Sequence, residues 1–292
     1  MKIPSNKIKD IRRYMNSTLE HIYDGKDTDC FLALLLETYA GINKATMYAE
    51  PEKTVSESVL LKINDGIKKL KKHMPIEYII GYTDFLGLKI QVNSNVLIPR
   101  PETEELCHFL INYLKKNNNT KAPIVLDACT GSGAIALSVK KNIPEAAVYA
   151  FDNVAASVKT AVKNAEAHHL NIHFFEADLF NFNTLETING VDVIISNPPY
   201  VRLSEKEMMQ ANVLDYEPHN ALFVKDEEAL VYYEQLARLG MLKLKKNGFL
   251  ICEINEALAH DVSALLKQHA YAAVKIFSDF NGKHRFATAL KK

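Results

Sequence analysis

Apolar positions in residues 5–73 recur every three or four residues, the spacing of helices with one buried face. The first such helix would bury Ile8, Ile11, Met15, Leu19 and Ile22. A second, more deeply buried helix would contain residues 31–36. It would begin at Asp27 or Thr28, because either side chain can accept a hydrogen bond from a free backbone N–H group.

A third helix is predicted to begin at Thr54, with Glu57 three residues later completing a capping box. It would bury Leu60, Ile63, Ile67 and Leu70. The end of this helix is basic, with Lys68, Lys69, Lys71, Lys72 and His73. These side chains could contact RNA or an acidic partner, or they could simply complement the helix dipole. Residues 1–74 are therefore expected to form a small N-terminal helical bundle domain.

Residues 75–101 combine Gly and Asp breaks with alternating apolar positions in LKIQV, a pattern that predicts a connector with a β-hairpin. The connector ends in LIPRPETE, where two prolines would hold Arg100 and Glu102 in a fixed loop. Alternatively, this is an ordinary proline-rich connector before a helix that begins near Glu102. Residues 102–292 would then form a second domain.

Apolar strand candidates alternate with amphipathic helices after about residue 122. The candidate strands are IVLDAC, AVYAFD, IHFFEAD, VDVIISN, GFLICEIN and AAVKIFSDF. Helices are predicted over residues 155–168 and 227–244. This alternation predicts an α/β domain with a mainly parallel sheet covered on both faces. Ligands of such sheets bind at the carboxyl ends of the strands.

The first strand runs into a glycine loop, VLDACTGSGAIALSV. Gly131 and Gly133 allow a tight turn and close approach of a ligand to the backbone, and a helix beginning near Ala134 offers free N–H groups. This predicts nucleotide or nucleoside binding. The same glycines with Ala136 also satisfy the dinucleotide pattern G-x-G-x-x-A, and glycines at such a turn can be purely steric.

Acidic residues follow the next two strands. Asp152 lies about 20 residues beyond the loop, where a carboxylate reaches ribose hydroxyls. Asp178 could accept a hydrogen bond from an adenine amino group, with Leu179 or Phe180 covering the base. Either carboxylate could instead cap a helix. With the glycine loop, they predict a cofactor that contains adenosine.

The fourth strand ends in Asn-Pro-Pro-Tyr, residues 197–200. An amide or exocyclic amine is a poor nucleophile, but the Asn197 side-chain oxygen and the Pro198 carbonyl could each accept one of its N–H groups. In a methyl-transfer enzyme, these two hydrogen bonds would hold the nitrogen in line with the methyl group of a sulfonium donor. Pro198 and Pro199 would fix the backbone and Tyr200 would pack on the planar group. The alternative is a strand that ends at prolines before a loop.

Composition narrows the function classes. The 292 residues carry 35 basic and 35 acidic side chains, so no global positive field attracts nucleic acid, although a local patch would be compatible with this balance. The N-terminus has no apolar signal core, and no stretch approaches the roughly 18 apolar residues of a membrane span. We therefore expect a cytoplasmic protein with no membrane partner. The cysteines lie far apart and neither they nor the histidines show metal-ligand spacing, so no metal site is expected.

These motifs together closely resemble the PrmC/HemK family, methyltransferases that modify the glutamine amide in the Gly-Gly-Gln motif of peptide chain release factors. The resemblance covers nearly the whole chain. It rests on PIEYIIG (75–81), LIPRPETE (97–104), ISNPPYV (195–201), DYEPHNAL (215–222), ICEI (251–254) and the late Asp279, Gly282 and Arg285. NPPY alone is shared with adenine-N6 DNA methyltransferases and some rRNA methyltransferases.

The resemblance implies a Rossmann-like class I fold with seven strands that uses S-adenosylmethionine and releases S-adenosylhomocysteine. The helical domain would help to hold the release factor. The implied cofactor residues are Cys129, Thr130, Gly131, Ser132 and Gly133 on the methionine side, Asp152 at the ribose, and Asp178 with Leu179 at the adenine. Asn197, Pro198, Pro199 and Tyr200 would grip the substrate, with Asn197 serving the cofactor as well. The implied substrate loop contains Arg100, Pro101, Glu102 and Thr103.

The chain departs from the family pattern at two places. Cys129 stands where the family usually has a glycine, which could tighten the cofactor loop, and DEEALVYYEQ replaces the usual Asp-Gly-Leu before the later helix. We expect direct in-line methyl transfer with neither a metal nor a covalent intermediate. Two other function classes stay open: a DNA or RNA amine methyltransferase, expected to carry a basic groove or recognition domain, and a non-catalytic adenosine-binding protein.

Overall fold

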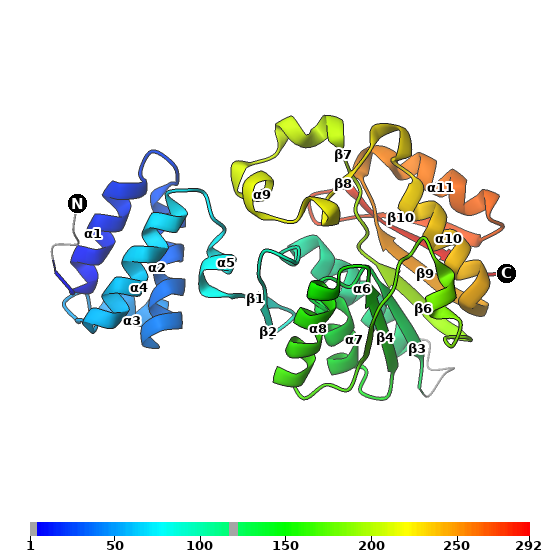
Figure 1. Cartoon of the computed structure of the whole chain (residues 1–292), viewed down its shortest axis with the longest axis horizontal. Coiled ribbons are helices and arrows are strands. Elements are labelled where there is room, and N and C mark those ends of the chain that lie inside the picture. The colour runs from blue at the N-terminus through cyan, green and yellow to red at the C-terminus, as the bar shows by residue number, and fades with distance from the viewer. Residues whose placement is uncertain (1–4, 117–121) are drawn as a thin grey trace. The chain divides into compact units, whose positions relative to one another are not determined.

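The computed structural model describes residues 5–116 and 122–292 and divides the chain into two compact units (Figure 1). The first unit contains the chain up to Tyr82 together with Gln210–Tyr216. The second contains Thr83–Met209 and Glu217–Lys292.

The first unit is helical and has its own apolar core. Its helices are α1 (Ile8–Leu19), α2 (Gly25–Ala40), α3 (Lys44–Ala49), α4 (Glu57–Leu70), α5 (Ile76–Ile80) and α9 (Ala211–Tyr216). The predicted faces of α1 and α4 are buried, except that Ile22 lies beyond the end of α1 and Leu60 is only partly buried. α3 and α9 were not predicted, since six residues are too few to show a helical period.

Both predicted helix starts in this unit are wrong by a few residues. Asp24 caps α2, accepting the N–H groups of Lys26 and Asp27, whereas Thr28 lies inside the helix. Ser56 caps α4, while Thr54 instead pairs with Lys7 in an isolated β-bridge. Sequence offers several capping side chains close together, and the one whose backbone is extended at the helix start becomes the cap.

The predicted hairpin is present as β1 (Tyr82–Phe85) and β2 (Leu88–Gln91). Its two-residue turn has positive φ at Leu86 and Gly87, which is typical of a type I′ turn. The Leu86 N–H donates to Glu104 of helix α6 (Pro101–Lys116). The connector also contains α5 (Ile76–Ile80), which was not predicted because the alternating pattern of LKIQV indicated only the hairpin.

The second unit is built on a sheet of seven strands in the order β10-β11-β9-β6-β3-β4-β5. The strands are β3 (Ile124–Ala128), β4 (Ala147–Asp152), β5 (His173–Glu176), β6 (Val191–Ser196), β9 (Leu244–Glu253), β10 (Ala272–Ser278) and β11 (His284–Leu290). Five strands from β5 to β9 run parallel, and β11 is antiparallel to both neighbours. This confirms the α/β class and the six predicted strands; β11 was missed.

Helices cover both faces of this sheet (Figure 1). α6 packs against α7 (Ala134–Asn142), which contacts α8 (Ala155–Ala167). α10 (Val231–Lys243) packs against α11 (Ala259–Gln268). Helix α10 begins four residues later than predicted. The segment DEEAL, which differs from the family pattern, first forms a short 3₁₀ turn at Asp226–Glu228.

The remaining elements are short. They are strands β7 (Val201–Arg202) and β8 (Phe223–Val224), and 3₁₀ turns at Phe182–Leu185, Leu203–Met208, His219–Ala221 and Glu256–Leu258. The sheet register pairs Ala128 with both Phe151 and Ser196, and Ser196 in turn with Cys252. The carboxyl ends of these strands therefore meet at one edge of the sheet.

Candidate active site

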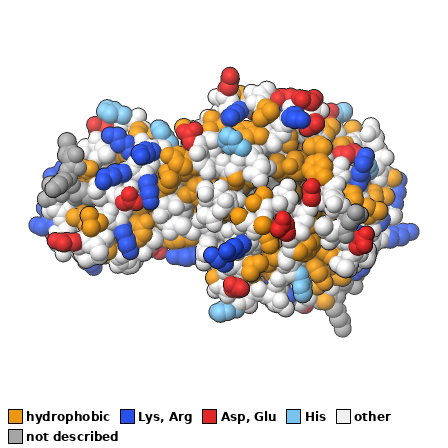
Figure 2. Space-filling view, in the orientation of Figure 1, with side chains coloured by type: hydrophobic (Ala, Val, Ile, Leu, Met, Phe, Trp, Pro, Cys, Tyr) orange, Lys and Arg blue, Asp and Glu red, His pale blue; other side chains and the backbone are white. Residues whose placement is uncertain are grey.

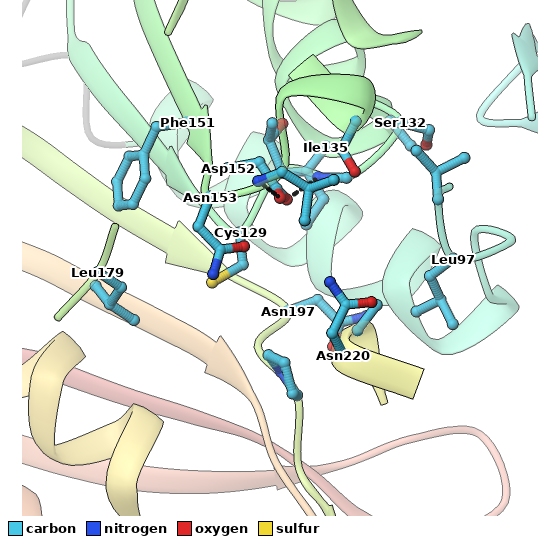
Figure 3. A pocket seen from close by; sticks show the side chains of 18 of the residues that line it. Leu97, Cys129, Ser132, Ile135, Phe151, Asp152, Asn153, Leu179, Asn197 and Asn220 are labelled. Carbon is cyan, nitrogen blue, oxygen red and sulfur yellow. Dashed lines mark hydrogen bonds between the residues drawn. The ribbon is translucent and has the colours of Figure 1, made fainter. Parts of the chain in front are cut away.

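A pocket lies at this edge and is lined by the segments that follow β3, β4, β5 and β6 (Figure 3). Predicted residues that line it are Thr103, Cys129, Thr130, Gly131, Ser132, Asp152, Asp178, Leu179, Asn197 and Pro199. A second, smaller pocket is lined by Arg100, Pro198 and Tyr200, and Asn197 lines both pockets. Asn197 thus lies where the two pockets meet.

Asp127, a buried residue of β3, anchors the loop that follows this strand. This buried carboxylate accepts the Thr130 hydroxyl at 2.6 Å and the Ala136 N–H at 3.2 Å through the same oxygen. Gly131 and Gly133 both have positive φ, but for different reasons. A Cβ on Gly131 would meet no atom within 4 Å, whereas one on Gly133 would lie 2.8 Å from Leu137 and 3.0 Å from Ala161. Gly131 therefore keeps the backbone open to a ligand, while Gly133 lets α7 approach α8.

Asp152 is held by backbone groups at the end of β4. Its Oδ2 accepts the Gly131 N–H at 2.9 Å and its Oδ1 accepts the Val154 N–H at 3.0 Å. Burial raises the pKa of Asp152, and these N–H donors oppose that shift. The alternative of a helix cap is wrong for Asp152, because α8 is capped at Val154 without a side-chain hydrogen bond.

The segment after β5 places Leu179 and Asp178 at the pocket. Leu179 is buried, whereas Phe180 is 45% exposed and packs edge-on against Tyr232 with ring centroids 5.2 Å apart. Of the two residues predicted to cover an adenine, only Leu179 lines the pocket. The Asp178 carboxylate accepts the Phe180 N–H at 2.9 Å, a turn contact made through Oδ1 alone. Its Oδ2 can accept a hydrogen bond from a ligand in the pocket.

Asn197 is held by a chain of side chains that sequence reasoning missed. Its Nδ2 donates to Thr103 Oγ1 at 3.0 Å, and the Thr103 hydroxyl donates to Glu253 Oε2 at 2.8 Å. The Tyr200 hydroxyl donates to the other oxygen, Glu253 Oε1, at 2.7 Å. Glu253 belongs to the segment ICEI, which was noted for its resemblance but given no role. Burial raises the pKa of both Tyr200 and Glu253.

The predicted substrate loop is only partly a loop. Pro101, Glu102 and Thr103 form the first turn of α6, since Pro101 is well suited to the first helical position. Arg100 precedes the helix and forms an ion pair with Glu217, whose other oxygen accepts the Ile98 N–H at 3.1 Å. The side chain of Glu217 is 1% exposed. Pro101 and Glu102 do not line either of these pockets.

Other lining residues were not identified from the sequence, among them Ile135, Asn153, Asn220 and Tyr232. Figure 3 shows Asp152 and Asn153 on one side of the hollow and Asn197 and Asn220 on another. The motif DYEPHNAL contains both Glu217 and Asn220, so its resemblance to the family was the available signal. Nothing in its spacing indicated a ligand contact.

The residues present fit the cofactor that the resemblance implies. The unobstructed Gly131 backbone suits a polar chain lying across the loop, and Asp152 offers acceptors for ribose hydroxyls. Apolar contact would come from Val96, Ile135, Phe151 and Leu179. Among the described residues no group of three or more His, Cys, Asp or Glu side chains could hold a metal ion. In the same described ranges, no helix combines the length and apolar character of a membrane span.

Two family models match the chain. Residues 10–81 match the PrmC N-terminal domain and residues 102–258 match the methyltransferase small domain. Among solved structures, the Thermus thermophilus 16S rRNA N2 G1207 methyltransferase RsmC, solved with AdoMet and guanosine, has a TM-score of 0.54 at 19% identity over 72% of this chain and 50% of that chain. The hMettl16 catalytic domain has a TM-score of 0.55 at 14% identity over 81% and 82%. These likenesses show the class I methyltransferase fold.

Curated relatives are much more similar in sequence. The release factor glutamine methyltransferase of Flavobacterium psychrophilum is 37% identical over 95% of this chain and 97% of that protein. That of Bacteroides thetaiotaomicron is 36% identical over 96% and 98%. The chain therefore belongs to the release factor glutamine methyltransferase family of S-adenosylmethionine-dependent enzymes.

Proposed function

We propose that this protein methylates the side-chain amide nitrogen of the glutamine in the Gly-Gly-Gln motif of peptide chain release factors. The observation that carries the proposal is the orientation of Asn197. One N–H of its NH₂ group donates to Thr103, so the amide is turned with its Oδ1 away from Thr103 and able to accept a hydrogen bond where the two pockets meet. Membership of the family supports the same substrate.

The chain's own residues would position the glutamine rather than activate it by proton removal. A planar NH₂ group has two N–H donors, and Asn197 Oδ1 and the Pro198 carbonyl supply two acceptors. With both N–H groups held in one plane, the nitrogen lone pair points out of that plane toward the cofactor pocket. Tyr200 lines the smaller pocket, where the glutamine would lie.

S-adenosylmethionine, when bound, supplies an electrophilic methyl group on sulfur. The glutamine nitrogen would gain this methyl group as the bond from the methyl carbon to sulfur breaks. It would then lose one proton, which can leave after transfer because the positively charged nitrogen is strongly acidic. Burial raises the pKa of the Cys129 thiol far above its usual range, which disfavours the thiolate that a covalent route would need. Asn197, Pro198 and the residues of the smaller pocket therefore act by orientation and by exclusion of water.

We assign the cofactor residues as the resemblance implies, with Asp152 at the ribose and Asp178 with Leu179 at the adenine. The loop from Cys129 to Gly133 would hold the methionine part. Arg100 is proposed to contact the release factor beside the smaller pocket, which it lines while paired with Glu217. Thr103 supports Asn197 from α6.

The helical domain is proposed to help hold the release factor, with domain boundaries at 1–74, 75–101 and 102–292. On the face shown in Figure 2, acidic and basic side chains are interspersed over the second unit. Together with the equal numbers of acidic and basic residues, this favours a protein substrate over a nucleic acid. We further propose that the enzyme acts in the cytoplasm, where release factors function.

The test is incubation of the purified protein with methyl-labelled S-adenosylmethionine and, separately, with its host's release factors and its host's nucleic acid. Label on a peptide that contains Gly-Gly-Gln, lost when the glutamine is replaced, supports the proposal. Label on nucleic acid alone would reassign the substrate to an amine of a base. Binding of the cofactor without any transfer would indicate the non-catalytic class.

A further inference from the structure

Glu253 is a buried ionisable side chain to which the proposed mechanism gives no direct contact with substrate or cofactor. It ends β9 and is 1% exposed, although glutamates are rarely buried unless they are paired. Strand β9 runs beside β6, and Cys252 pairs with Ser196. The carboxylate therefore lies next to the point where the chain continues into Asn197.

The hydrogen bonds of Glu253 have a fixed direction. An ionised carboxylate only accepts, so both hydroxyls that touch it must donate: Tyr200 to Oε1 at 2.7 Å and Thr103 to Oε2 at 2.8 Å. A hydroxyl has one proton, and that of Thr103 is used on Glu253. The contact between Thr103 and Asn197, at 3.0 Å, must then have the asparagine as donor.

This direction decides which way the Asn197 amide faces. If the amide were rotated by half a turn, its oxygen would face a Thr103 oxygen that has no proton to offer. Glu253 thus disfavours the rotated amide without touching it. In the favoured orientation Oδ1 is free to accept from the substrate, whereas the rotated amide would present an NH₂ group to the NH₂ of glutamine and repel it.

We propose that Glu253 is a positioning residue that acts through the Thr103 hydroxyl to hold the Asn197 amide oxygen toward the substrate. This inference rests on the proposed function, because it concerns the grip on a planar NH₂ group. It assigns a role to the motif ICEI. The hydrogen bond through which Glu253 would act joins the first turn of α6, at Thr103, to the end of β9.

Glu253→Gln tests the inference, because glutamine keeps the shape of the side chain but adds a donor. When the glutamine NH₂ group donates to Thr103 Oγ1, the threonine hydroxyl no longer donates to residue 253. It can then donate to Asn197 instead, which favours the rotated amide with its oxygen toward Thr103. We expect kcat to fall at least about tenfold, approaching the ~10²-fold loss typical of a misplaced reacting group, with a smaller change in cofactor Kd. Glu256→Gln, an exposed glutamate of the next turn, is the matched control and should keep wild-type kcat.

A double-mutant cycle separates positioning from a general structural role. Thr103→Val removes the hydroxyl through which Glu253 would act, so adding Glu253→Gln should lower kcat little further. Thr103→Ser keeps the hydroxyl and should lose much less kcat than Thr103→Val. The inference would be overturned if the factors by which the two single substitutions lower kcat multiply in the double variant. It would also be overturned if Thr103→Ser and Thr103→Val lower kcat equally. The serine and valine pair decides the question if Glu253→Gln does not fold.

A measurement without substrate separates this inference from the proposed function. In wild-type protein, NMR should show the Asn197 side-chain NH₂ protected from exchange with solvent by its bond to Thr103, and Glu253→Gln should lose that protection. Equal protection in both proteins overturns the inference. A wild-type protein that shows the protection but transfers no methyl group to release factors would overturn the proposed function alone.

Discussion

The two halves of the active site are held in different ways. On the cofactor side, Asp152 is fixed by two backbone N–H groups, from Gly131 and Val154, 21 and 2 residues away. On the substrate side, Asn197 is fixed by the side chain of Thr103, 94 residues away, which is in turn fixed by Glu253. One half is held by backbone groups of the loops beside it, and the other by side chains from distant parts of the sequence.

This difference sets how each half responds to substitution. Backbone donors persist when side chains are replaced, so the cofactor side should tolerate changes around Asp152 as long as the loop keeps its conformation. On the substrate side, Asn197, Thr103 and Glu253 form a relay, that is, a chain of side-chain hydrogen bonds. Such a chain is interrupted when any member loses its donor or acceptor. Single substitutions should therefore affect the substrate side more than the cofactor side.

The largest effect is expected from Asn197→Ala, which removes the end of the relay. Loss of one preorganised hydrogen-bonding group at a reacting centre commonly lowers kcat about 10²–10³-fold. Because Asn197 also lines the cofactor pocket, cofactor affinity should fall as well, but by a smaller factor. Single-turnover kinetics and calorimetric titration of the cofactor measure the two effects. Full activity in a folded Asn197→Ala protein would refute the proposed grip.

Asp152→Ala should affect cofactor affinity more than kcat, the reverse of what is expected for Asn197→Ala. The variant loses acceptors for ribose hydroxyls and for the Gly131 N–H, and charge-assisted hydrogen bonds are worth roughly 1.5–3 kcal/mol each. We expect cofactor affinity to fall about 10- to 100-fold, with kcat at saturating cofactor changed less. Glu176→Gln is the control, since Glu176 pairs with Asp152 in the sheet but is exposed. Unchanged cofactor affinity in Asp152→Ala would remove Asp152 from the cofactor site.

Sequence patterns predicted the parts of the fold that depend on neighbouring residues. The parallel strands and α7 follow from apolar runs and from the glycine loop. Strand β11 was missed because it opens with His284 and Arg285 and because two of its four buried residues are the small Ala287 and Ala289. Its place is set by pairing with β9, which local sequence does not reveal.

The same limit applies to the active site. Asp152 was predicted because its partner Gly131 lies one strand and one helix away in a known loop pattern. The role of Glu253 could not be predicted, since its contact with Thr103 spans 150 residues and forms only when α6 packs against the end of β9. A glutamate at the end of an apolar strand was the available signal, but it did not indicate which side chains the glutamate contacts.

A pH dependence is expected from Asp127, the carboxylate beneath the cofactor loop. Burial raises its pKa from 3.8 to about 7, so between these values the folded protein holds a proton that the unfolded chain has released. The free energy of unfolding should therefore fall as pH rises toward 7, by at most about 1.4 kcal/mol per unit from this group, with no further loss above it.

Asp127→Asn should remove this slope. Its amide oxygen can still accept from Thr130 and Ala136, and its NH₂ would replace Oδ1, a buried oxygen without a hydrogen-bond partner among the described residues. Chemical denaturation at intervals between pH 5 and pH 8 compares the two proteins. Parallel stability curves would mean that Asp127 titrates at its ordinary pKa.

The smallest effect is expected at Cys129, where a side chain occupies a backbone conformation that favours glycine. Its φ is 59°, in the left-handed region, which is strained for residues with a Cβ. Cys129→Gly should relieve this strain while making the unfolded chain more flexible, so the free energy of unfolding should change by about 1 kcal/mol or less. Cys129→Ser keeps the Cβ and should show no such relief, so it serves as the control in denaturation and cofactor titrations. If the cofactor loop is held by its backbone, both variants should bind the cofactor nearly as well as the wild type. A large loss of affinity in both would mean that the thiol itself supports the cofactor, and the cofactor side would then depend on a side chain as the substrate side does.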